Sequence, residues 1–581
     1  MKYTEKKNIT GAEALLSSLI NQGVKTVFGY PGGSITPVYD RLQDYPELRH
    51  LLTRHEQGAV HAAQGYARVS NRTGVCMATS GPGATNLLTG IADAMLDSTP
   101  VVCIAAQVPS TALGTDFFQE ADMINMTVPI TKWNYQITRF DEIVPTLAKA
   151  FYIAASGRPG PVYIEVTKDA LLERGDYKWE PCTGIRSYNP VPAVDADAVQ
   201  EALTLINDAE RPLILVGNGV KISGAEEAVI RLAEAGNIPV AATLMGLSCI
   251  PSGHPLNIGM VGMHGNVAGN RMTQEADLLV AIGMRFSDRV TGNLNTYAPK
   301  AKVIHIEIDP VEIDKNVRTD LAIVADAREA VEAILGAGAI IRKSRAEWFE
   351  AAERYAAEER ERVIDRQLRP ERDTLTMGET VAAVARQTAG EAVIVTDVGQ
   401  HQMMAARYSA YKHTRSLITS GGLGTMGYGL PAAIGAKVAL DEEATAREGR
   451  PARGREVVVF LGDGGFQMTM QELGTMLHWG IPVKVVVLNN SFLGMVRQWQ
   501  QLFMGKRYNA TELVNPDFVK IAEAYGIPAQ RITRREELGE AVETLLKTEG
   551  PCFIEVIVGK EDNVFPMVPG GASLDDLLYS E

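Results

Sequence analysis

The sequence predicts an α/β protein built from three doubly wound parallel sheets. Apolar strand-like runs alternate with helical stretches, and this alternation favours parallel strands joined by crossover helices. The chain of 581 residues is too long for one hydrophobic core, since a prior of roughly 150 residues per domain gives three or four domains. The pattern of the first segment also returns near the C-terminus, so two similar sheets should flank a different middle one.

The first domain is expected over residues 1–185. Its predicted elements share short apolar runs bounded by glycine or polar residues; they are helices over 12–22 and 35–42, strands over 27–29, 51–53, 75–79 and 101–106, and a helix of small residues over 59–66. A proline-spotted stretch, 179–192, predicts the linker that follows.

The second and third domains are expected over 193–345 and 373–560. The second should contain a helix over 196–208 and strands over 212–216, 277–282 and 302–308; the third should contain strands over 392–396, 456–461, 483–488 and 552–558 and a helix over 466–479. The charged run 344–369 between them is typical of a solvated helix. The last residues, 561–581, predict a loop or lid because prolines and glycines recur there.

Composition excludes several classes of function. The net charge of −14 argues against a nucleic-acid partner, because no basic stripe is present to displace counterions from phosphates. No apolar run approaches membrane-spanning length and the N-terminus lacks a signal-like apolar core, so we expect a cytoplasmic protein without membrane contact. The five cysteines lie far apart without a CxxC pair, which predicts apolar packing and no zinc or redox site.

The most informative motif is Gly462-Asp463-Gly464, which follows one predicted strand, with Asn490 after the next. Both strands should end at the same edge of the sheet. There a carboxylate, an amide oxygen and the backbone carbonyl of Phe492 form the oxygen set that Mg²⁺ shares with phosphates, while the next helix points its amides at the diphosphate. Alone, the glycines would indicate an ordinary strand–turn–helix. With Asn490 the spacing resembles the fingerprint of thiamin diphosphate (ThDP) enzymes.

Glu56 is the candidate catalytic carboxylate. It lies between a strand-like run and a helix of small residues, and a glutamate that bonds the cofactor's pyrimidine nitrogen N1′ is what ThDP needs to become reactive. The alternative is a glutamate that interacts with a helix dipole, which is common. The metal motif elsewhere in the chain favours catalysis.

Nearly the whole chain resembles the catalytic large subunits of the acetolactate synthases, also called acetohydroxyacid synthases. The runs that carry the resemblance are FGYPGG (28–33), HEQG (55–58), SGPGATN (80–86), GTDFFQE (114–120), GRPGP (157–161), RFSDRVTG (285–292), VGQHQM (398–403) and GMVRQWQ (494–500). Several recur in other ThDP enzymes, whereas 285–292 and 494–500 are more specific. The resemblance implies the ThDP-enzyme architecture: a pyrimidine-binding domain, a central FAD-binding domain and a diphosphate-binding domain.

The same resemblance implies the residues that hold ThDP. They are Val398, Gly399, Gln400, His401, Gly424, Met426, Gly462, Gly464, Gly465 and Met495, with Asp463, Asn490 and Phe492 on Mg²⁺. Met426 would be the apolar wedge that bends the cofactor, although beside a turn it could equally be a core methionine. Gly33 and Gln119 would approach the reacting centre. Because the family builds each site between the first domain of one subunit and the third of another, a homodimer or tetramer is implied.

The predicted reaction decarboxylates pyruvate and joins the product to a second 2-oxo acid. The acceptor is pyruvate or 2-oxobutanoate, giving 2-acetolactate or 2-aceto-2-hydroxybutanoate for branched-chain amino acid biosynthesis. Arg289 offers a planar guanidinium to the acceptor carboxylate and Trp499 an apolar wall, with Phe118 and Lys168 as further substrate contacts. The alternatives are a surface ion pair for Arg289 and a core anchor for Trp499.

A second cofactor, FAD, is expected in the central domain. A strand ending at Gly283 and an acid at Glu307 echo dinucleotide binding, but the glycines do not form GxGxxG, so this signal is weak. The family's anabolic branch binds FAD without net redox chemistry, through residues matching Arg158, Gly217, Gly219, Thr243, Leu244, Met263, His264, Gly283, Arg285, Glu307 and Asp326. The catabolic branch lacks the RFxDR run that stands here at 285–289. Met284 and Ala325 depart from the family's usual residues.

Other functions stay open at this point. One is a different ThDP-dependent lyase or oxidase, such as a pyruvate oxidase, which acetyl phosphate formation would reveal. Another is a non-catalytic nucleotide-binding protein, which would have no need of Glu56, Asp463 and Asn490. A small regulatory subunit is a further expected partner that the sequence does not test.

Overall fold

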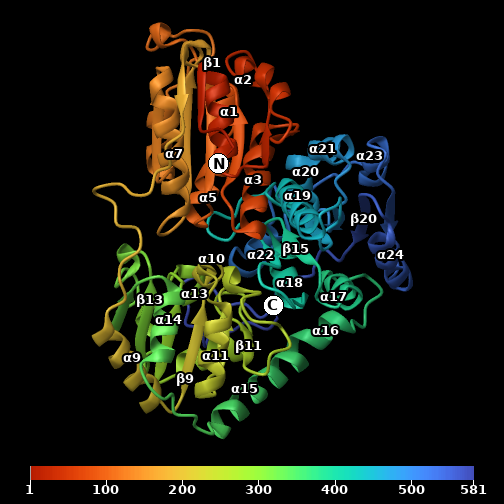
Figure 1. Cartoon of the computed structure of the whole chain (residues 1–581). Helices are drawn as coiled ribbons and strands as arrows, with labels where there is room; N and C mark the ends of the chain where they lie inside the picture. The colour runs from red at the N-terminus through yellow and green to blue at the C-terminus, as the bar shows by residue number, and fades with distance from the viewer. Residues whose placement is uncertain (1, 581) are drawn as a thin grey trace.

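The computed structural model describes residues 2–580 and contains three parallel six-stranded sheets (Figure 1). The first sheet has the order β3-β2-β4-β5-β7-β6, and the strands are β2 (Thr26–Gly29), β3 (Arg49–Leu52), β4 (Gly74–Ala78), β5 (Val101–Gln107), β6 (Trp133–Ile137) and β7 (Pro161–Thr167). A separate antiparallel pair, β1 (Glu5–Thr10) with β8 (Arg174–Lys178), closes this domain.

The third sheet repeats this topology. Its order is β16-β15-β17-β18-β20-β19, and its strands are β15 (Val393–Thr396), β16 (Leu417–Ile418), β17 (Val457–Gly462), β18 (Lys484–Asn489), β19 (Ala529–Ile532) and β20 (Cys552–Ile557). Numbered by chain position within each sheet, both orders are 2-1-3-4-6-5. The prediction of two similar sheets is therefore confirmed.

The central sheet is different, with the order β11-β10-β9-β12-β13-β14. Its strands are β9 (Pro212–Val216), β10 (Val240–Ala242), β11 (Asn257–Met260), β12 (Leu278–Ile282), β13 (Lys302–Glu307) and β14 (Leu321–Val324). Within the domain this order is 3-2-1-4-5-6, the arrangement of doubly wound dinucleotide-binding folds.

Helices cover the faces of the three sheets (Figure 1). Those of the first domain are α1 (Gly11–Asn21), α2 (Thr36–Arg41), α3 (Glu56–Ser70), α4 (Pro82–Thr85), α5 (Leu88–Leu96), α6 (Met123–Thr127), α7 (Ile143–Ala155) and α8 (Lys168–Leu172). The central domain has α9 (Ala196–Asp208), α10 (Asn218–Ser223), α11 (Glu226–Gly236), α12 (Val267–Glu275), α13 (Asp288–Thr291) and α14 (Ala327–Gly336), and α15 (Ala346–Glu359) and α16 (Asp365–Leu368) lead out of it. The third domain has α17 (Met377–Thr388), α18 (Gln400–Tyr408), α19 (Gly429–Glu448), α20 (Asp463–Thr469), α21 (Leu473–Trp479), α22 (Gly494–Phe503), α23 (Phe518–Ala524) and α24 (Arg535–Lys547). Among the described residues, none of the helices combines the length and the apolar surface needed to cross a bilayer.

Most predicted elements agree with the structure, and one helix does not. α9 and β9 match the predicted ranges residue for residue. The prediction of one helix over 466–479 is wrong, because a 3₁₀ turn, Met470–Glu472, divides this segment into α20 and α21. The turn directs the Glu472 carboxylate into the first domain, where it accepts the backbone N–H of Arg54 at 3.1 Å. A tertiary contact has overridden the local helical pattern.

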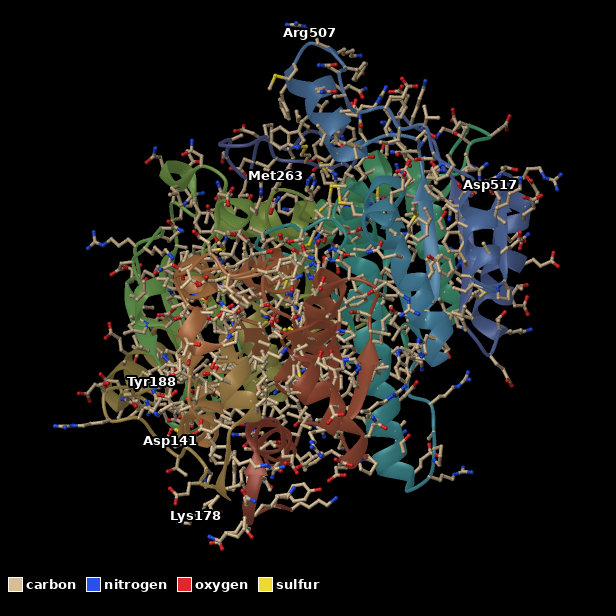
Figure 2. All side chains as sticks on the ribbon, turned by 90° about the horizontal axis from the view of Figure 1, so that it is seen from above. Asp141, Lys178, Tyr188, Met263, Arg507 and Asp517 are labelled. Atoms are coloured by element: carbon tan, nitrogen blue, oxygen red, sulfur yellow. The ribbon has the colours of Figure 1, made fainter. Side chains whose placement is uncertain are left out.

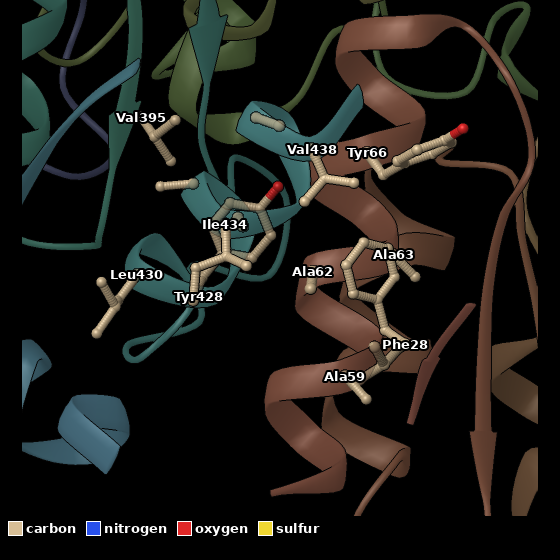
Figure 3. Packing of buried hydrophobic residues seen from close by; sticks show 14 of the residues in the cluster. Phe28, Ala59, Ala62, Ala63, Tyr66, Val395, Tyr428, Leu430, Ile434 and Val438 are labelled. Carbon is tan, nitrogen blue, oxygen red and sulfur yellow. The ribbon is translucent and has the colours of Figure 1, made fainter. Parts of the chain in front are cut away.

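The first and third domains pack through α3 and α19 (Figure 3). Glycines let the two backbones approach closely, since a Cβ on Gly65 would lie 1.9 Å from the carbonyl oxygen of Ala432. A Cβ on Gly435 would likewise lie 1.8 Å from the carbonyl oxygen of Ala62. Around this crossing one continuous apolar core is shared by both domains, so their relative position is tightly defined.

The last residues form an ordered loop over the central domain. Met567 and Leu578 pair as an isolated antiparallel bridge, and the Val568 amide donates to the Met263 carbonyl at 2.8 Å. Figure 2 shows Arg507 at the outer tip of the segment that follows α22. The domain bounds given above stay predictions, although the strands of each sheet fall within them.

Candidate active site

Two adjoining cavities open at the carboxyl ends of the central and third sheets. The larger encloses about 660 Å³ and is lined by all three domains. The smaller encloses about 50 Å³ within the third domain. Val398, Gly399, Met426, Met495 and Val496 line both, so the two cavities meet along these residues. Ligands of doubly wound folds bind in such crevices, where neighbouring strands lead to helices on opposite faces.

Glycines shape the smaller cavity, which lies between the ends of β15 and β17. A Cβ on Gly465 would lie 2.0 Å from Oδ2 of Asp397, and one on Gly462 would lie 2.8 Å from Nδ1 of His401. Only backbone therefore fits at these positions. α18 and α20 both begin at this cavity, and backbone amides at helix N-termini are a suitable site for a diphosphate.

Asp463 and Asn490 supply the oxygen atoms of the predicted metal site. The Asp463 carboxylate is buried and accepts Nδ2–H of Asn515 at 2.8 Å, and burial raises the pKa of Asp463 to about 6. Oδ1 of Asn490 accepts the Phe492 amide at 3.1 Å. One carboxylate, one amide oxygen and a nearby carbonyl fit the preference of Mg²⁺ for a few protein oxygens beside phosphate oxygens. Among residues 2–580, no three His, Cys, Asp or Glu side chains gather as a metal-binding cluster.

His401 gives a further test of whether a ligand fits. Its ring lines the smaller cavity and is buried, and its Nε2 atom has no hydrogen-bond partner among the described residues. Burial lowers the pKa of His401 to about 3, so the ring is neutral. A buried polar atom without a partner usually marks the place of a missing ligand or water. The cavity therefore fits a polar ligand such as a diphosphate.

The larger cavity lies where the central sheet reverses its winding, between β9 and β12. The Gly219 amide donates to the Gly283 carbonyl at 2.8 Å, and a Cβ on Gly217 would lie 2.3 Å from that same oxygen. All eleven residues predicted to bind FAD line this cavity: Arg158, Gly217, Gly219, Thr243, Leu244, Met263, His264, Gly283, Arg285, Glu307 and Asp326. Its volume and its glycine-rich floor fit a dinucleotide.

Charged groups mark one end of the larger cavity. Burial raises the pKa of Glu307 to about 7. Arg158 reaches across from the first domain and donates to Asp309 at 3.1 Å and to Glu312 at 2.8 Å. His264 lines the cavity with a buried Nδ1 atom that has no partner among the described residues. These donors and acceptors suit the ribose and phosphate groups of a dinucleotide.

Arg289 and Trp499 stand on the rim of the larger cavity. The Arg289 guanidinium is exposed, donates to the Met263 sulfur at 3.3 Å and has only a 3.7 Å contact with the exposed Asp288 carboxylate. The Trp499 ring is half-buried beside Phe503, with ring centroids 5.0 Å apart. Arg289 thus has a long, exposed ion pair with Asp288 and Trp499 is only partly buried, and the substrate roles of both residues stay predictions.

Five predicted site residues lie elsewhere, at the carboxyl edge of the first sheet. Over residues 2–580, the lining of both cavities lacks Gly33, Glu56, Phe118, Gln119 and Lys168. Glu56 is the first residue of α3, and its buried carboxylate accepts Nδ2–H of Asn86 at 2.9 Å. A Cβ on Gly33 would meet nothing within 4 Å, and Phe118 is 81% exposed. Within one chain, these residues therefore lie outside the lining of the cradle that should hold the cofactor.

Sequence reasoning missed two acids near the cavities. Asp397 directly follows β15 and accepts the Gly427 amide at 2.9 Å. Its position after a buried apolar strand, like that of Asp463, could have marked it as a candidate site residue in the sequence. Asp97 lines the larger cavity and accepts the backbone amides of Gly421 and Gly422. No local pattern could reveal Asp97, because these partners are more than 300 residues away in the sequence.

Three family models match the chain, all described as parts of thiamine pyrophosphate enzymes. They are the N-terminal TPP binding domain at residues 9–126, the central domain at 199–334 and the C-terminal TPP binding domain at 397–556. Similar curated proteins include acetolactate synthase large subunits. That of Mycobacterium tuberculosis is 46% identical over 98% of this chain and 91% of its own length. That of Corynebacterium glutamicum is 44% identical over 99% and 91%, and the isozyme 2 large subunit of Escherichia coli is 43% identical over 98% and 99%.

Proposed function

Since the chain belongs to the acetolactate synthase large subunits of the thiamine pyrophosphate enzyme family, we propose how its residues divide the work of that reaction. The enzyme is a ThDP-dependent transferase that decarboxylates pyruvate and joins the remaining two-carbon unit to a second 2-oxo acid. The product enters branched-chain amino acid biosynthesis. The observation that carries the proposal is the glycine cradle of the smaller cavity, with Asp463 and Asn490 in its wall.

When bound, ThDP supplies the nucleophilic carbon and the electron sink that decarboxylation of a 2-oxo acid requires. Asp463, Asn490 and the Phe492 carbonyl would hold Mg²⁺ beside the diphosphate. Gln400, His401, Gly462, Gly464 and Gly465 line the cradle, and Met426 lies at the junction of the two cavities. The support is geometric: a Cβ at Gly462 or Gly465 would enter a neighbouring side chain, and His401 leaves a buried nitrogen unbonded among the described residues.

The larger cavity would hold FAD. The glycines at the ends of β9 and β12 leave room for a pyrophosphate, while Glu307 and Asp326 offer carboxylates to a ribose. No residue of this cavity is assigned a redox step. The flavin would act by filling the space between the central and third domains, and thereby by supporting the rim that carries Arg289 and Trp499.

Glu56 would act in a site shared with a second copy of the chain. In one chain its carboxylate lies outside both cavities, yet it is buried and fixed by Asn86 at the first residue of α3. We propose that the first domain of a second copy brings this carboxylate to the cradle, where it holds a proton at its Oε atoms for exchange with the pyrimidine nitrogen N1′. The minimum unit is then a homodimer, with a tetramer formed from two such pairs.

Arg289 would bind the carboxylate of the acceptor 2-oxo acid. Its planar guanidinium suits a bidentate carboxylate, and it stands exposed on the rim with Trp499 beside the same cavity. Trp499 would supply an apolar wall that favours 2-oxobutanoate over pyruvate. Gly33, Phe118, Gln119 and Lys168 would close the pocket from the second copy and exclude water.

A partner, a compartment and the domain bounds are also proposed. The relatives are named large subunits, which supports a small regulatory subunit as a partner. The cytoplasm is the proposed compartment, because all five cysteines are free thiols and four of them are buried, as is usual in a reducing environment. The bounds 1–185, 193–345 and 373–560 are proposed as the functional domains.

One assay tests the reaction and separates it from its alternatives. The purified chain is incubated with pyruvate, ThDP, Mg²⁺ and inorganic phosphate, and acetolactate and acetyl phosphate are measured with and without oxygen. We expect acetolactate at the same rate in both, and we expect FAD to copurify. Oxygen-dependent acetyl phosphate would instead identify an oxidase, and the absence of any product with tight ThDP binding would identify a non-catalytic binding protein.

A further inference from the structure

A buried ionic cluster joins the first and third domains beneath the turn that follows β16. Arg68 comes from the last turn of α3, while Asp93 lies in α5 and Asp97 directly follows it. Their side chains are 9%, 0% and 1% exposed. The proposed catalytic steps use none of these residues. Burying three charges is costly unless each one is paired.

Asp97 holds the backbone of the turn directly. Its Oδ2 accepts the Gly421 amide at 3.0 Å and its Oδ1 accepts the Gly422 amide at 2.6 Å. Arg68 donates to the same carboxylate at 2.6 Å and also to the Thr419 carbonyl at the start of the turn. Two consecutive amides of the third domain are therefore bonded to a carboxylate of the first domain, and charge-assisted bonds of this kind are stronger than neutral ones.

Asp93 holds the same turn through side chains. Its Oδ1 accepts the hydroxyls of Ser420 and of Thr425, the latter at 2.8 Å. Its Oδ2 lies 3.9 Å from Arg68 and has no hydrogen-bond partner among the described residues. Burial, and then the neighbouring charge of Asp97, raise the pKa of Asp93 to about 6. The environment thus disfavours the charged form of this carboxylate, and acids with such raised pKa values are common at functional sites.

The turn itself forms part of the proposed cofactor site. Residues 420–424 line the larger cavity, and Met426 lies where the two cavities meet. There is no space to move the turn closer to its support, because a Cβ on Gly422 would lie 2.9 Å from both Oδ1 of Asp97 and Nη2 of Arg285. The position of the turn is therefore set by the carboxylates below it.

We propose that Asp97, supported by Arg68 and Asp93, is a positioning residue that sets the place of the 420–426 turn and through it the affinity of the site for ThDP. The inference rests on the proposed binding of ThDP in the smaller cavity. It assigns to the first domain a second task beside Glu56, namely holding the cofactor turn of its own chain.

Asp97→Asn tests this proposal. It replaces one carboxylate oxygen with an NH₂ group, which cannot accept a hydrogen bond from the three present donors, the Gly421 amide, the Gly422 amide and Arg68. ThDP is titrated with Mg²⁺ into the full-length chain and followed by tryptophan fluorescence, and kcat and KM for pyruvate are measured at saturating ThDP. We expect the ThDP Kd to rise about tenfold or more, which is the scale of a lost charge-assisted hydrogen bond. We also expect the KM for pyruvate to change less than twofold.

Asp277→Asn is the matched control. The Asp277 carboxylate also accepts two consecutive amides, those of Glu210 and Arg211, at 2.8 and 2.9 Å, but it lies outside the lining of both cavities. This variant should show a similar loss of thermal stability and an unchanged ThDP Kd. An unchanged Kd in Asp97→Asn, or an equal rise in both variants, would overturn the proposal.

Thr425→Val keeps the test decisive if Asp97→Asn does not fold. Valine has the shape of threonine and removes only the hydroxyl that Asp93 accepts, and Thr425 is buried without lining either cavity. We expect its ThDP Kd to rise about threefold or more, the lower end of one lost hydrogen bond; a Kd equal to that of the wild type would overturn the proposal. Because the titration measures binding, it stands apart from acetolactate formation by the wild type, which tests the proposed function.

Discussion

The first and third sheets share one strand order, but their carboxyl edges differ. In the third sheet, the residues after β15 and β17 fold over a narrow cradle in which Gly462 and Gly465 touch neighbouring side chains. In the first sheet, the residues after β2 leave Gly33 open, and Phe118 extends outward with 81% of its surface exposed. The same topology has therefore produced a closed cradle once and an open edge once. We infer that the open edge is completed by another copy of the chain.

Two glutamates at equivalent positions of the first and third sheets have different hydrogen-bond partners. Glu165 on β7 lies opposite Gln136, and Glu555 occupies the corresponding strand, β20, opposite Arg531. Arg531 donates to Glu555 at 2.7 Å, whereas the partners of Glu165 among residues 2–580 are all neutral: Gln136, Gln107 and Tyr163. Burial raises the pKa of Glu165 to about 7. Equivalent positions thus carry a paired charge in one sheet and an unpaired acid in the other.

The largest expected effect separates Glu56 from an ordinary helix-terminal glutamate. Glu56→Gln should lower kcat by about 10²–10⁴, the usual contribution of a positioned acid or base, and leave the ThDP Kd within threefold. Glu13→Gln is the control, since Glu13 caps the first turn of α1. It should lower thermal stability and leave kcat unchanged. Equal kcat values for both variants would make Glu56 a structural residue.

Glycine substitutions test the closed and the open edge directly. A Cβ on Gly465 would lie 2.0 Å from Asp397, so Gly465→Ala should weaken ThDP binding about 10- to 100-fold, as expected from overpacking by 1–3 kcal/mol. Gly33→Ala meets no atom within 4 Å in the single chain; it should keep the melting temperature and the ThDP Kd of the wild type but lower kcat.

Gly539→Ala in α24 is the neutral control, because its Cβ also meets nothing within 4 Å. It should leave ThDP binding and kcat unchanged. If Gly33→Ala behaved in the same way, the open edge would have no part in the reaction.

Aromatic residues after the fourth strand of each sheet offer a smaller effect. Trp499→Leu should reduce the preference for 2-oxobutanoate over pyruvate by about tenfold, which is the scale of one methylene contact, while acetolactate formation from pyruvate alone continues. Phe118→Leu should raise the KM for pyruvate a few-fold although Phe118 lies outside both cavities of its own chain. Competition between the two acceptors gives the product ratio. The control is Trp133→Leu, a change on β6 outside both cavity linings. A wild-type product ratio in Trp499→Leu would show that Trp499 does not set the acceptor preference.

The last expected effect is one of stability against pH, not of catalysis. Because the pKa of Glu165 is raised to about 7 in the folded protein from 4.5, the folded state binds more protons than the unfolded state between these values. Its contribution to stability is therefore present below about pH 4.5 and lost as the pH rises towards 7. Glu165→Gln removes this titration, so its stability relative to the wild type should rise between pH 5 and 8 by roughly 2–3 kcal/mol.

Denaturant unfolding at several pH values measures this slope. The opposite sign is expected at the matching position, because Glu555→Gln removes the charge that pairs with Arg531 and replaces one of the two oxygens that accept from Arg531 and Asn489; it should destabilise the protein by about 1–2 kcal/mol at neutral pH. A flat difference for Glu165→Gln from pH 5 to 8 would show that the carboxyl does not titrate in this window.

Much of the fold could be predicted from sequence because apolar strands and their turns are local signals. β9 and α9 were predicted to the residue, and the duplicated sheet was visible from its spacing. The strands that were missed are mostly short or lie at sheet edges: β1, β6, β7, β8, β10, β11, β14, β16 and β19. The break between α20 and α21 could not be seen because it depends on Glu472 reaching Arg54 in another domain.

The candidate site was predictable where chemistry follows a strand directly, as at Asp463 and Asn490. The residues predicted from family resemblance for FAD all line one cavity, although the binding of FAD itself stays a prediction. Arg68, Asp93 and Asp97 were out of reach, since their partners in the third domain are distant in sequence and each lies in or directly after an ordinary helix. What sequence could not supply is the contact between domains.

Subunit complementation tests the central claim, that one copy supplies the cradle and another supplies Glu56. Glu56→Gln and Asp463→Asn chains, each nearly inactive alone, are dissociated, mixed one to one and allowed to reassociate. If the site is shared, half of the dimers are mixed and each holds one intact site, so about a quarter of wild-type activity should return. If Glu56 and Asp463 act within one chain, the mixture would stay as inactive as its components, and the account would be contradicted.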